Sequence, residues 1–294
     1  MNKLDLSVVI LHYNDFSMTK AYIENLKEQN WQGISHHYIV VDNASPDGSG
    51  EKLKTIFADT PETVVLLSED NLGFAKGNNL GIRYADANFN SDLIVVSNND
   101  IVIEDREFMQ KLVGVYLRER FALFGPDIFS IRKNVHQSPI RSCHLSCEEV
   151  QNKMVELDRT LWKLKLVEKI KVYDLLRKLK EIVGKPRPHA AHWDSVQEGV
   201  VLQGAFFVLA ERYMKAYPDG LYPGTFLYME EDILNYRAKK ENLRILYDPS
   251  LSVLHLDGAS TLSSAGTRCK KYIFELEQTK ISCQKMLEYM SANR

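Results

Sequence analysis

Short apolar runs alternate with amphipathic segments throughout the first 130 residues of the chain. The runs are rich in β-branched residues and almost continuously apolar, which is typical of parallel strands covered by helices on both faces. We expect strands at 6–11, 37–42, 63–68, 92–97 and 121–125. Segments with helical spacing lie between them, at 17–29, 48–57, 73–85 and 105–119. This α/β order predicts right-handed crossovers and a Rossmann-like, mostly parallel central sheet with helices on both faces.

Polar residues gather where three of these predicted strands end. The clusters are His12-Tyr13-Asn14-Asp15, Asp42-Asn43-Ala44-Ser45 and Asn98-Asn99-Asp100. Each cluster alone is explained by a turn or a helix cap, because Asp and Asn side chains often bond the nearby backbone. In parallel sheets, however, ligands bind beyond the carboxyl ends of the strands. Three polar clusters at the carboxyl ends of the strands therefore predict a ligand site at that edge of the sheet.

The second half of the chain continues the pattern less regularly. We expect a strand at 200–210, a short helix at 211–220, a helix at 229–242, one or two strands at 243–256 and a C-terminal helix at 263–290. In that last helix the apolar spacing predicts core positions at Tyr272, Ile273, Leu276 and Met286.

Residues 148–187 have helical spacing and a different charge from the rest of the chain. Residues 151–187 hold eleven Lys and Arg against five Asp and Glu, a difference of +6, so with a net charge of -2 the remainder carries -8. A basic amphipathic segment suits an anionic membrane surface. A helical hairpin docked on the sheet with a solvated basic face explains it too. The small net charge disfavours nucleic acid as a partner.

Length and cysteine content limit the class of protein and the cellular compartment that the sequence fits. The 294 residues, 45% of them hydrophobic, provide for a large core. No run approaches the roughly 20 apolar residues of a membrane span, and the N-terminal apolar run is too short for a signal peptide. Four cysteines without a framework spacing indicate a reducing compartment. We therefore expect a cytoplasmic protein, with the basic segment compatible with peripheral contact with the inner membrane.

Acids and one histidine are the candidates for chemistry. Asp100 follows a buried strand, and Asn98 and Asn99 add neutral oxygens. Mg²⁺ and Mn²⁺ are usually held by one or two carboxylates plus phosphate oxygens, so this stretch suits a metal only when the ligand brings negative charge. Glu230-Glu231-Asp232 opens a predicted helix, where acids can simply stabilise the helix dipole. His255 ends an apolar run and is either a satisfied core residue or a metal ligand.

Six fragments occur in an order that resembles one known family. They are LSVVILHYND, YIVVDNASPDGS, SEDNLGFAKGNNLGI and LIVVSNNDIVI, then GAFFVLAERYM and FLYMEEDILNYRAKKENLRILYDPSLSVLHLDGAS. This ordered set, over 6–128 and 200–260, resembles the inverting glycosyltransferases of family 2, which have the GT-A fold. It is similar especially to bacterial members that build rhamnose- or galactose-containing surface polysaccharides. A dinucleotide site, a phosphate loop and a nucleophile elbow are disfavoured, because their motifs are missing from the sequence.

The resemblance implies a donor-binding role for six residues. Asp42 matches the aspartate that bonds the N3–H of uracil or thymine, and Tyr13 would line the nucleoside pocket. Asn43, Asn98 and Asn99 stand at the same strand ends and would contact the donor. Asn78 stands where many relatives have a phosphate-facing arginine.

The resemblance also implies a metal and a base. Asp100 matches the last acid of the DxD-type motif, whose first acid is here Asn98, and His255 would complete the coordination of Mg²⁺ or Mn²⁺. Asp232 matches the general base, with Glu231 beside it in the same motif.

Taken together, the expected activity is transfer of a sugar from a UDP- or dTDP-sugar to a hydroxyl of a glycan acceptor, with a lipid-linked glycan as one option. Residues 1–130 would bind the nucleotide sugar, 131–199 form a basic helical insertion, 200–260 hold the catalytic half, and 261–294 form a C-terminal loop and helix. The loop 258–267 would close over the donor. Two alternatives stay open, a nucleotidyltransferase and a degenerate nucleotide-sugar-binding module.

Overall fold

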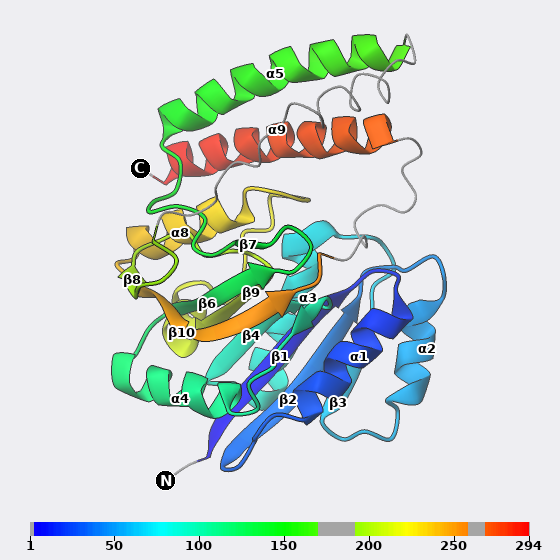
Figure 1. The fold of residues 1–294 in the computed structure, drawn as a ribbon, viewed down its shortest axis with the longest axis vertical. Helices are drawn as coiled ribbons and strands as arrows, with labels where there is room; N and C mark the ends of the chain where they lie inside the picture. The colour runs from blue at the N-terminus through cyan, green and yellow to red at the C-terminus, as the bar shows by residue number, and fades with distance from the viewer. Residues whose placement is uncertain (1–2, 170–191, 258–267, 294) are drawn as a thin grey trace.

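The structure is a computed structural model, and it describes residues 3–169, 192–257 and 268–293. A twisted sheet crosses the molecule, helices cover it on both faces, and two long helices form a further layer (Figure 1). In the described residues the sheet has ten strands, ordered β3-β2-β1-β4-β9-β6-β10-β5, with β7 paired to β6 and β8 paired to β10.

The first half of the sheet is parallel, as the alternating pattern predicts. It consists of β1 (Leu4–His12), β2 (Ile34–Asp42), β3 (Thr63–Leu67) and β4 (Leu93–Asn98). The crossovers carry α1 (Phe16–Lys27), α2 (Ser49–Ile56) and α3 (Gly73–Phe89). Both sheet faces are buried: Val8 and Ile10 belong to one core cluster, and Val9 belongs to the cluster on the opposite face. Continuous hydrophobicity in these strands therefore reflects burial on two sides.

The second half of the sheet is mixed. Its strands are β5 (Ile101–Val102), β6 (Leu123–Ser130), β7 (Val135–His136), β8 (Gln197–Glu198), β9 (Phe206–Ala210) and β10 (Ile245–His255). β9 runs antiparallel between β4 and β6, whereas β10 is parallel to β6. The helices of this half are α4 (Phe108–Glu119), α7 (Glu211–Ala216) and α8 (Glu230–Lys240). The segment for which one or two strands were expected is one strand, whose register against β6 shifts between Tyr247 and Ser252.

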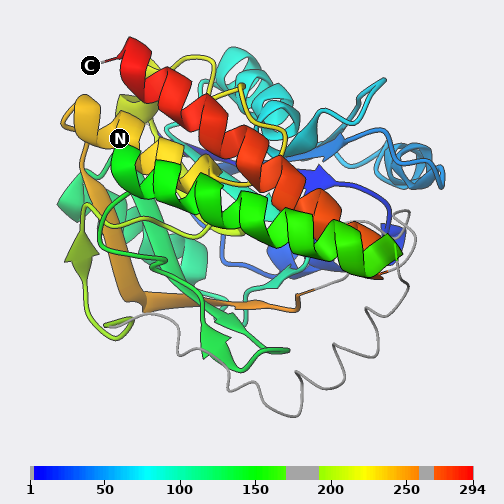
Figure 2. The same cartoon turned by 90° about the horizontal axis from the view of Figure 1, so that it is seen from above.

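Two antiparallel helices, α5 (Cys147–Lys169) and α9 (Arg268–Ala292), form the outer layer. Figure 2 shows them crossing the molecule side by side, and Figure 1 shows α9 between α5 and the sheet. Leu157 and Leu161 of α5 pack towards Met286 and Ile273 of α9. α5 confirms the helix expected from residue 148 as far as 169, whereas 170–187 and the loop 258–267 lie outside the described residues.

One predicted core residue of α9 is exposed. Ile273 and Met286 are buried as expected, but 40% of Tyr272 is accessible. The apolar spacing identified the right helix but not the outer limit of its buried face. No helix in the described ranges is both long enough and apolar enough to cross a membrane.

Candidate functional site

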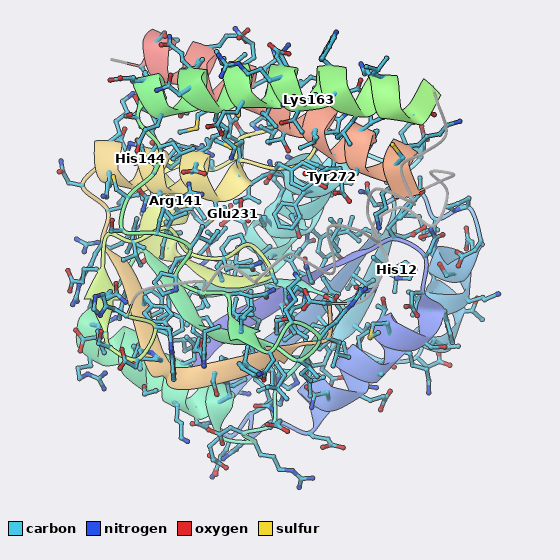
Figure 3. All side chains as sticks on the ribbon, turned by 45° about the horizontal axis from the view of Figure 1, so that its top comes forward. His12, Arg141, His144, Lys163, Glu231 and Tyr272 are labelled. Carbon is cyan, nitrogen blue, oxygen red and sulfur yellow. The ribbon has the colours of Figure 1, made fainter. Side chains whose placement is uncertain are left out.

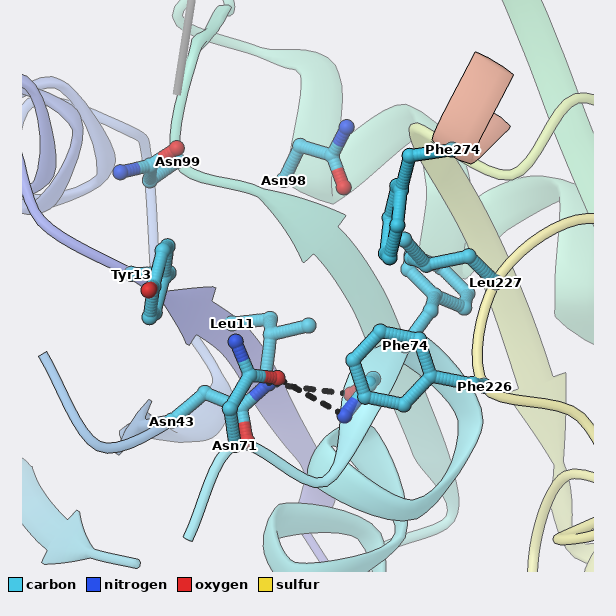
Figure 4. A pocket seen from close by; sticks show the side chains of 11 residues that line it. Leu11, Tyr13, Asn43, Asn71, Phe74, Asn98, Asn99, Phe226, Leu227 and Phe274 are labelled. Atoms are coloured by element: carbon cyan, nitrogen blue, oxygen red, sulfur yellow. Dashed lines mark hydrogen bonds between the residues drawn. The ribbon is translucent and has the colours of Figure 1, made fainter. Parts of the chain in front are cut away.

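A cavity of about 320 Å³ lies at the carboxyl ends of β1, β2 and β4 (Figure 4). Four of the predicted donor-binding residues line it, namely Tyr13, Asn43, Asn98 and Asn99. The other lining residues are Leu11, Asn71, Gly73, Phe74, Phe226, Leu227 and Phe274. Ligand pockets of this size usually combine apolar walls with a few oriented polar groups, and this cavity has that composition.

Asn43 fixes the wall of the cavity that leads into α3. Its Nδ2 donates to Asn71 Oδ1 and to the carbonyl of Gly73, both at 3.1 Å, and its Oδ1 accepts from the backbone N–H of Leu72 at 2.8 Å (Figure 4). Gly73 has a φ of +76°, and a Cβ there would lie 2.2 Å from the carbonyl oxygen of Phe226. A glycine is therefore required where the two walls meet.

A chain of hydrogen bonds orients Asn99. Ser49 Oγ donates to Asp47, so it accepts from His12 Nε2–H at 2.7 Å. His12 Nδ1 then accepts from the Thr19 hydroxyl at 2.7 Å, and Thr19 accepts from Asn99 Nδ2 at 2.8 Å. Burial lowers the pKa of His12, which keeps the ring neutral in this role. The chain turns the Asn99 amide nitrogen towards α1 and leaves its oxygen for a ligand.

Two predicted donor-binding residues lie outside the cavity wall. Asp42 Oδ1 accepts from the backbone N–H of Ser45 at 3.2 Å and from its hydroxyl at 2.5 Å. The same carboxylate lies so close to Gly50 that a Cβ there would be 2.0 Å from Oδ2. Asn78 is fully buried in α3 and donates to the Phe74 carbonyl at 3.0 Å, while its Oδ1 has no hydrogen-bond partner among the described residues. Their contact with a donor stays a prediction.

Asp100 and His255 come together because β5 pairs with the end of β10. His255 Nε2 lies 3.2 Å from Asp100 Oδ1, and both residues are buried. His255 Nδ1 is 2.8 Å from Gln137 Oε1, and Gln137 Nε2 donates to Asp257 at 3.3 Å. Because the amide oxygen of Gln137 accepts from Nδ1–H, the other ring nitrogen faces the Asp100 carboxylate. That arrangement is favourable only with a proton or a cation between them.

The pair fits part of a metal site. Adjacent ligands of an octahedral ion bound at 2.0–2.1 Å are about 3 Å apart, close to the observed Asp100–His255 spacing. No group of three or more His, Cys, Asp or Glu that could hold a metal occurs in the described part of the chain. The two residues therefore suit a divalent ion whose other ligands are water and phosphate oxygens.

The two predicted catalytic acids have different surroundings, and Figure 3 labels Glu231 and Arg141 among them. Asp232 is 3% exposed, and its Oδ1 accepts from Arg141 Nη1 and from the backbone N–H of Leu145 at 3.0 Å. Glu231 lies against Gly204, where a Cβ would be 2.8 Å from its Oε1. Burial, and secondly the charge of Asp232, raise the pKa of Glu231. Asp232 thus has a cationic partner and a backbone donor, whereas Glu231 lies against the backbone of Gly204.

Glu231 is linked to the strand that ends at the cavity through the segment it contacts. Gly204 precedes Ala205, whose carbonyl accepts from the backbone N–H of Asn98 at 2.9 Å. The Glu231 carboxylate therefore lies beside the strand end that carries Asn98 and Asn99. Its neighbour Glu230 has a pKa raised to about 8, mainly by burial and then by the charge of Glu231.

Sequence reasoning missed the far wall of the cavity. Phe226 and Leu227 precede α8, and Phe274 comes from α9. The far wall of the cavity is therefore formed by three apolar residues from late in the chain. Arg141 and Gln137, which hold Asp232 and His255, were missed as well. The spacing of these residues carries no signal of contact, because each pairing joins segments distant in the sequence.

The mixed sheet, parallel in its first half and with a pocket at the strand ends, has the GT-A fold, which it shares with solved glycosyltransferases. GalNAc-T7 with UDP, GalNAc and Mn²⁺ superposes with a TM-score of 0.59 at 13% identity, over 89% of this chain and 46% of that chain. A mannosyltransferase from Pyrobaculum calidifontis, in complex with GDP-Man and Mn²⁺, gives 0.52 at 12% identity, over 98% and 73%.

The model of glycosyl transferase family 2 matches residues 7–178, and the chain belongs to that family. The dTDP-rhamnosyl transferase RfbF of Shigella flexneri is 29% identical over 154 residues, which is 52% of this chain and 47% of RfbF. The match thus spans about half the length of that relative.

Proposed function

We propose that the protein is an inverting glycosyltransferase that moves a sugar from a UDP- or dTDP-sugar to a hydroxyl of a glycan acceptor. One observation carries the proposal: side chains from three parallel strand ends, Tyr13, Asn43, Asn98 and Asn99, line one cavity beside the buried Asp100–His255 pair. Family membership supports it, as do the GDP-Man named with one solved structure and the UDP and GalNAc named with the other. The rhamnosyl transferase relative supports a dTDP-sugar as one candidate donor.

The cavity would hold the nucleoside end of the donor. The Asn99 oxygen, oriented by Thr19 and His12, is a hydrogen-bond acceptor for the base or the ribose. Phe74 and Leu11 supply apolar contact, and Tyr13 supplies an aromatic face. Asp42 would bond the base N3–H if its carboxylate turned away from Ser45.

Asp100 and His255 would hold Mg²⁺ or Mn²⁺ against the diphosphate. When bound, the ion supplies positive charge to the leaving nucleoside diphosphate. In this chain Gln137 keeps the His255 ring oriented, and Asn98 offers a neutral oxygen in place of a second acid. Because the protein provides one carboxylate, the donor diphosphate has to provide most of the negative charge at this site.

We assign the general base to Glu231 in preference to Asp232. The acceptor hydroxyl gives its proton to a Glu231 oxygen while its own oxygen attacks the anomeric carbon from the face opposite the diphosphate. The bond from that carbon to the diphosphate breaks, and the nucleoside diphosphate leaves with the electron pair. A raised pKa suits this role, since a stronger base takes the proton more readily. Asp232 and Arg141 position the start of α8 beside it.

The test is turnover of UDP- and dTDP-sugars with and without Mn²⁺, followed by NMR of the product's anomeric configuration. Metal-dependent release of the nucleoside diphosphate with inversion is the expected result. Nucleotide binding without turnover of any donor would instead indicate a binding module. Pyrophosphate release from a nucleoside triphosphate and a sugar phosphate would indicate a nucleotidyltransferase.

A further inference from the structure

The two outer helices carry an unusual share of exposed apolar surface. Of the ten large hydrophobic side chains that are exposed in the described residues, five lie on α5 and α9. They are Val155, Trp162, Leu166, Tyr272 and Ile281. Scattered exposed apolar residues are normal, but a concentration on one layer marks an interaction surface.

Four residues of α5 form a continuous outward stripe. Val155, Arg159, Trp162 and Leu166 follow one another at steps of four, three and four residues, which places them on one helix face. Val155 is 49% exposed, Trp162 69% and Leu166 50%. Leu157 and Leu161 point the other way and pack towards α9. The α5 stripe is therefore exposed, and α5 itself belongs to the outermost layer of the molecule (Figure 1).

The charge around the α5 stripe is positive in its second half. Residues 159–169 contain four basic residues, Arg159, Lys163, Lys165 and Lys169, against the single acid Glu168. Arg159 and Lys163 form no ion pair with the described part of the chain, and Lys163 lies on α5 in Figure 3. By sequence alone, residues 170–187 add six Lys and Arg against two Asp and Glu. A tryptophan and leucine flanked by cations is the composition of a helix that lies on an anionic bilayer.

The stripe is also close to the cavity. Phe274 of α9 lines the cavity, while Ile273 beside it packs in a cluster with Leu161 of α5. The bodies of α5 and α9 thus lie between the α5 stripe and the site, and the axes of packed helices are about 8–10 Å apart. A protein lying on a bilayer through α5 would hold the cavity on the membrane-facing side of the sheet, with α5 and α9 between the cavity and the lipid.

We propose that the α5 stripe docks the protein on an anionic phospholipid bilayer and thereby presents the pocket to a lipid-linked acceptor. The docking itself is independent of the activity, whereas the lipid-linked acceptor rests on the proposed function. Trp162 and Leu166 enter the interfacial region, and Arg159 and Lys163 contact lipid phosphates.

The test is cosedimentation of the full chain with two kinds of vesicle. One is pure phosphatidylcholine, and the other contains about 30% phosphatidylglycerol, which is anionic. Binding is expected on the anionic vesicles and is expected to weaken with added salt. Arg159→Gln with Lys163→Gln should lower the partition coefficient about 25-fold, from roughly fivefold for each cation. Trp162→Ser with Leu166→Ser should lower it by about tenfold or more.

Matched controls lie on other faces of the molecule. Ile56→Ser with Leu117→Ser removes apolar residues that are 44% and 52% exposed, and Lys52→Gln with Lys54→Gln removes two exposed cations of α2. These variants should bind vesicles as the parent does. Equal loss in stripe and control variants, unchanged binding in the stripe variants, or a Trp162-dependent dimer in light scattering would overturn the proposal. Donor hydrolysis in vesicle-free buffer, unchanged in the stripe variants, keeps this result separate from the activity.

Discussion

Arg141 donates a hydrogen bond to the carboxylate of Asp232, and Leu145 N–H donates to the same oxygen. The segment that leads into α5 is thereby anchored to the first turn of α8. Of the three neighbouring acids at that helix start, Asp232 is the least exposed and has the cationic partner. The two adjacent acids therefore have different surroundings, which supports the proposal that Glu231 and not Asp232 is the general base.

We therefore expect opposite consequences from two conservative substitutions. Glu231→Gln should lower kcat by about 10²–10⁴, the usual contribution of a general base, with little change in Tm. Asp232→Asn should cost about 1–3 kcal/mol of stability through the weakened bonds to Arg141 and Leu145, with a smaller loss of turnover. Steady-state kinetics and thermal unfolding of both variants check this. Arg141→Gln is the matched control and should reproduce the stability loss; a large kcat loss in Asp232→Asn alone would return the base role to Asp232.

The activity should also depend on pH in a defined direction. Burial raises the pKa of Glu231, so this carboxyl becomes protonated at a higher pH than an ordinary glutamate. A protonated base cannot accept the acceptor proton, so kcat should fall as the pH falls through that raised pKa. A kcat profile from pH 5 to 9 shows whether the acidic limb lies above the ordinary value of 4.5. The residual activity of Glu231→Gln should lack this limb, and a limb shared by both proteins would assign it to another group.

Stability should depend on pH through Glu230. Its pKa is raised from 4.5 to about 8, so the folded state holds a proton that the unfolded state releases between these values. The stabilising protonated form is present at pH 4.5 and is lost as the pH rises through 8. Glu230→Gln should remove this loss and raise Tm at pH 8.5 by a few degrees, about 2–4 °C per kcal/mol, with little effect at pH 5. Exposed Glu104→Gln is the control, and a pH-independent gain in Glu230→Gln would contradict the assignment.

Metal binding by Asp100 and His255 should be measurable in the absence of turnover. Asp100→Asn should weaken Mn²⁺ binding in the presence of UDP by about tenfold or more, because affinity depends on ligand charge. Electron paramagnetic resonance of free Mn²⁺ measures this directly. Asp59→Asn, which changes an exposed aspartate of the same charge, should leave Mn²⁺ binding as it is. Equal Mn²⁺ affinity in parent and Asp100→Asn would remove Asp100 from the metal site.

The local sequence pattern was sufficient to predict the parallel strands and the ligand site at their carboxyl ends. The β-branched runs identified β1 to β4, and polar residues at their ends identified the cavity that Tyr13, Asn43, Asn98 and Asn99 line. Both signals depend on residues close in sequence, where alternation and strand termination follow from backbone geometry.

Pairings between distant segments were beyond sequence reasoning. β9 lies antiparallel between β4 and β6, which turns a parallel pattern into a mixed sheet. Phe274 reaches the cavity from the C-terminal helix, next to Tyr272, which is exposed against expectation. Spacing within a helix shows which side chains share a face, but a helix packed on two sides has two buried faces and a narrow exposed edge.

The hydrogen-bond chain behind Asn99 gives the last prediction. Thr19→Val keeps the side-chain volume but removes the hydroxyl that joins Asn99 to His12, so the amide of Asn99 loses its fixed orientation. One lost hydrogen bond of about 1 kcal/mol should raise the Kd for UDP or dTDP about fivefold in calorimetry. Thr19→Ser retains the hydroxyl and should restore affinity, which distinguishes orientation from packing. Thr55→Val removes an exposed hydroxyl that bonds the Glu51 carbonyl, and it should leave Kd at the parent value. An unchanged Kd in Thr19→Val would mean that nucleotide binding does not use the oriented Asn99 amide.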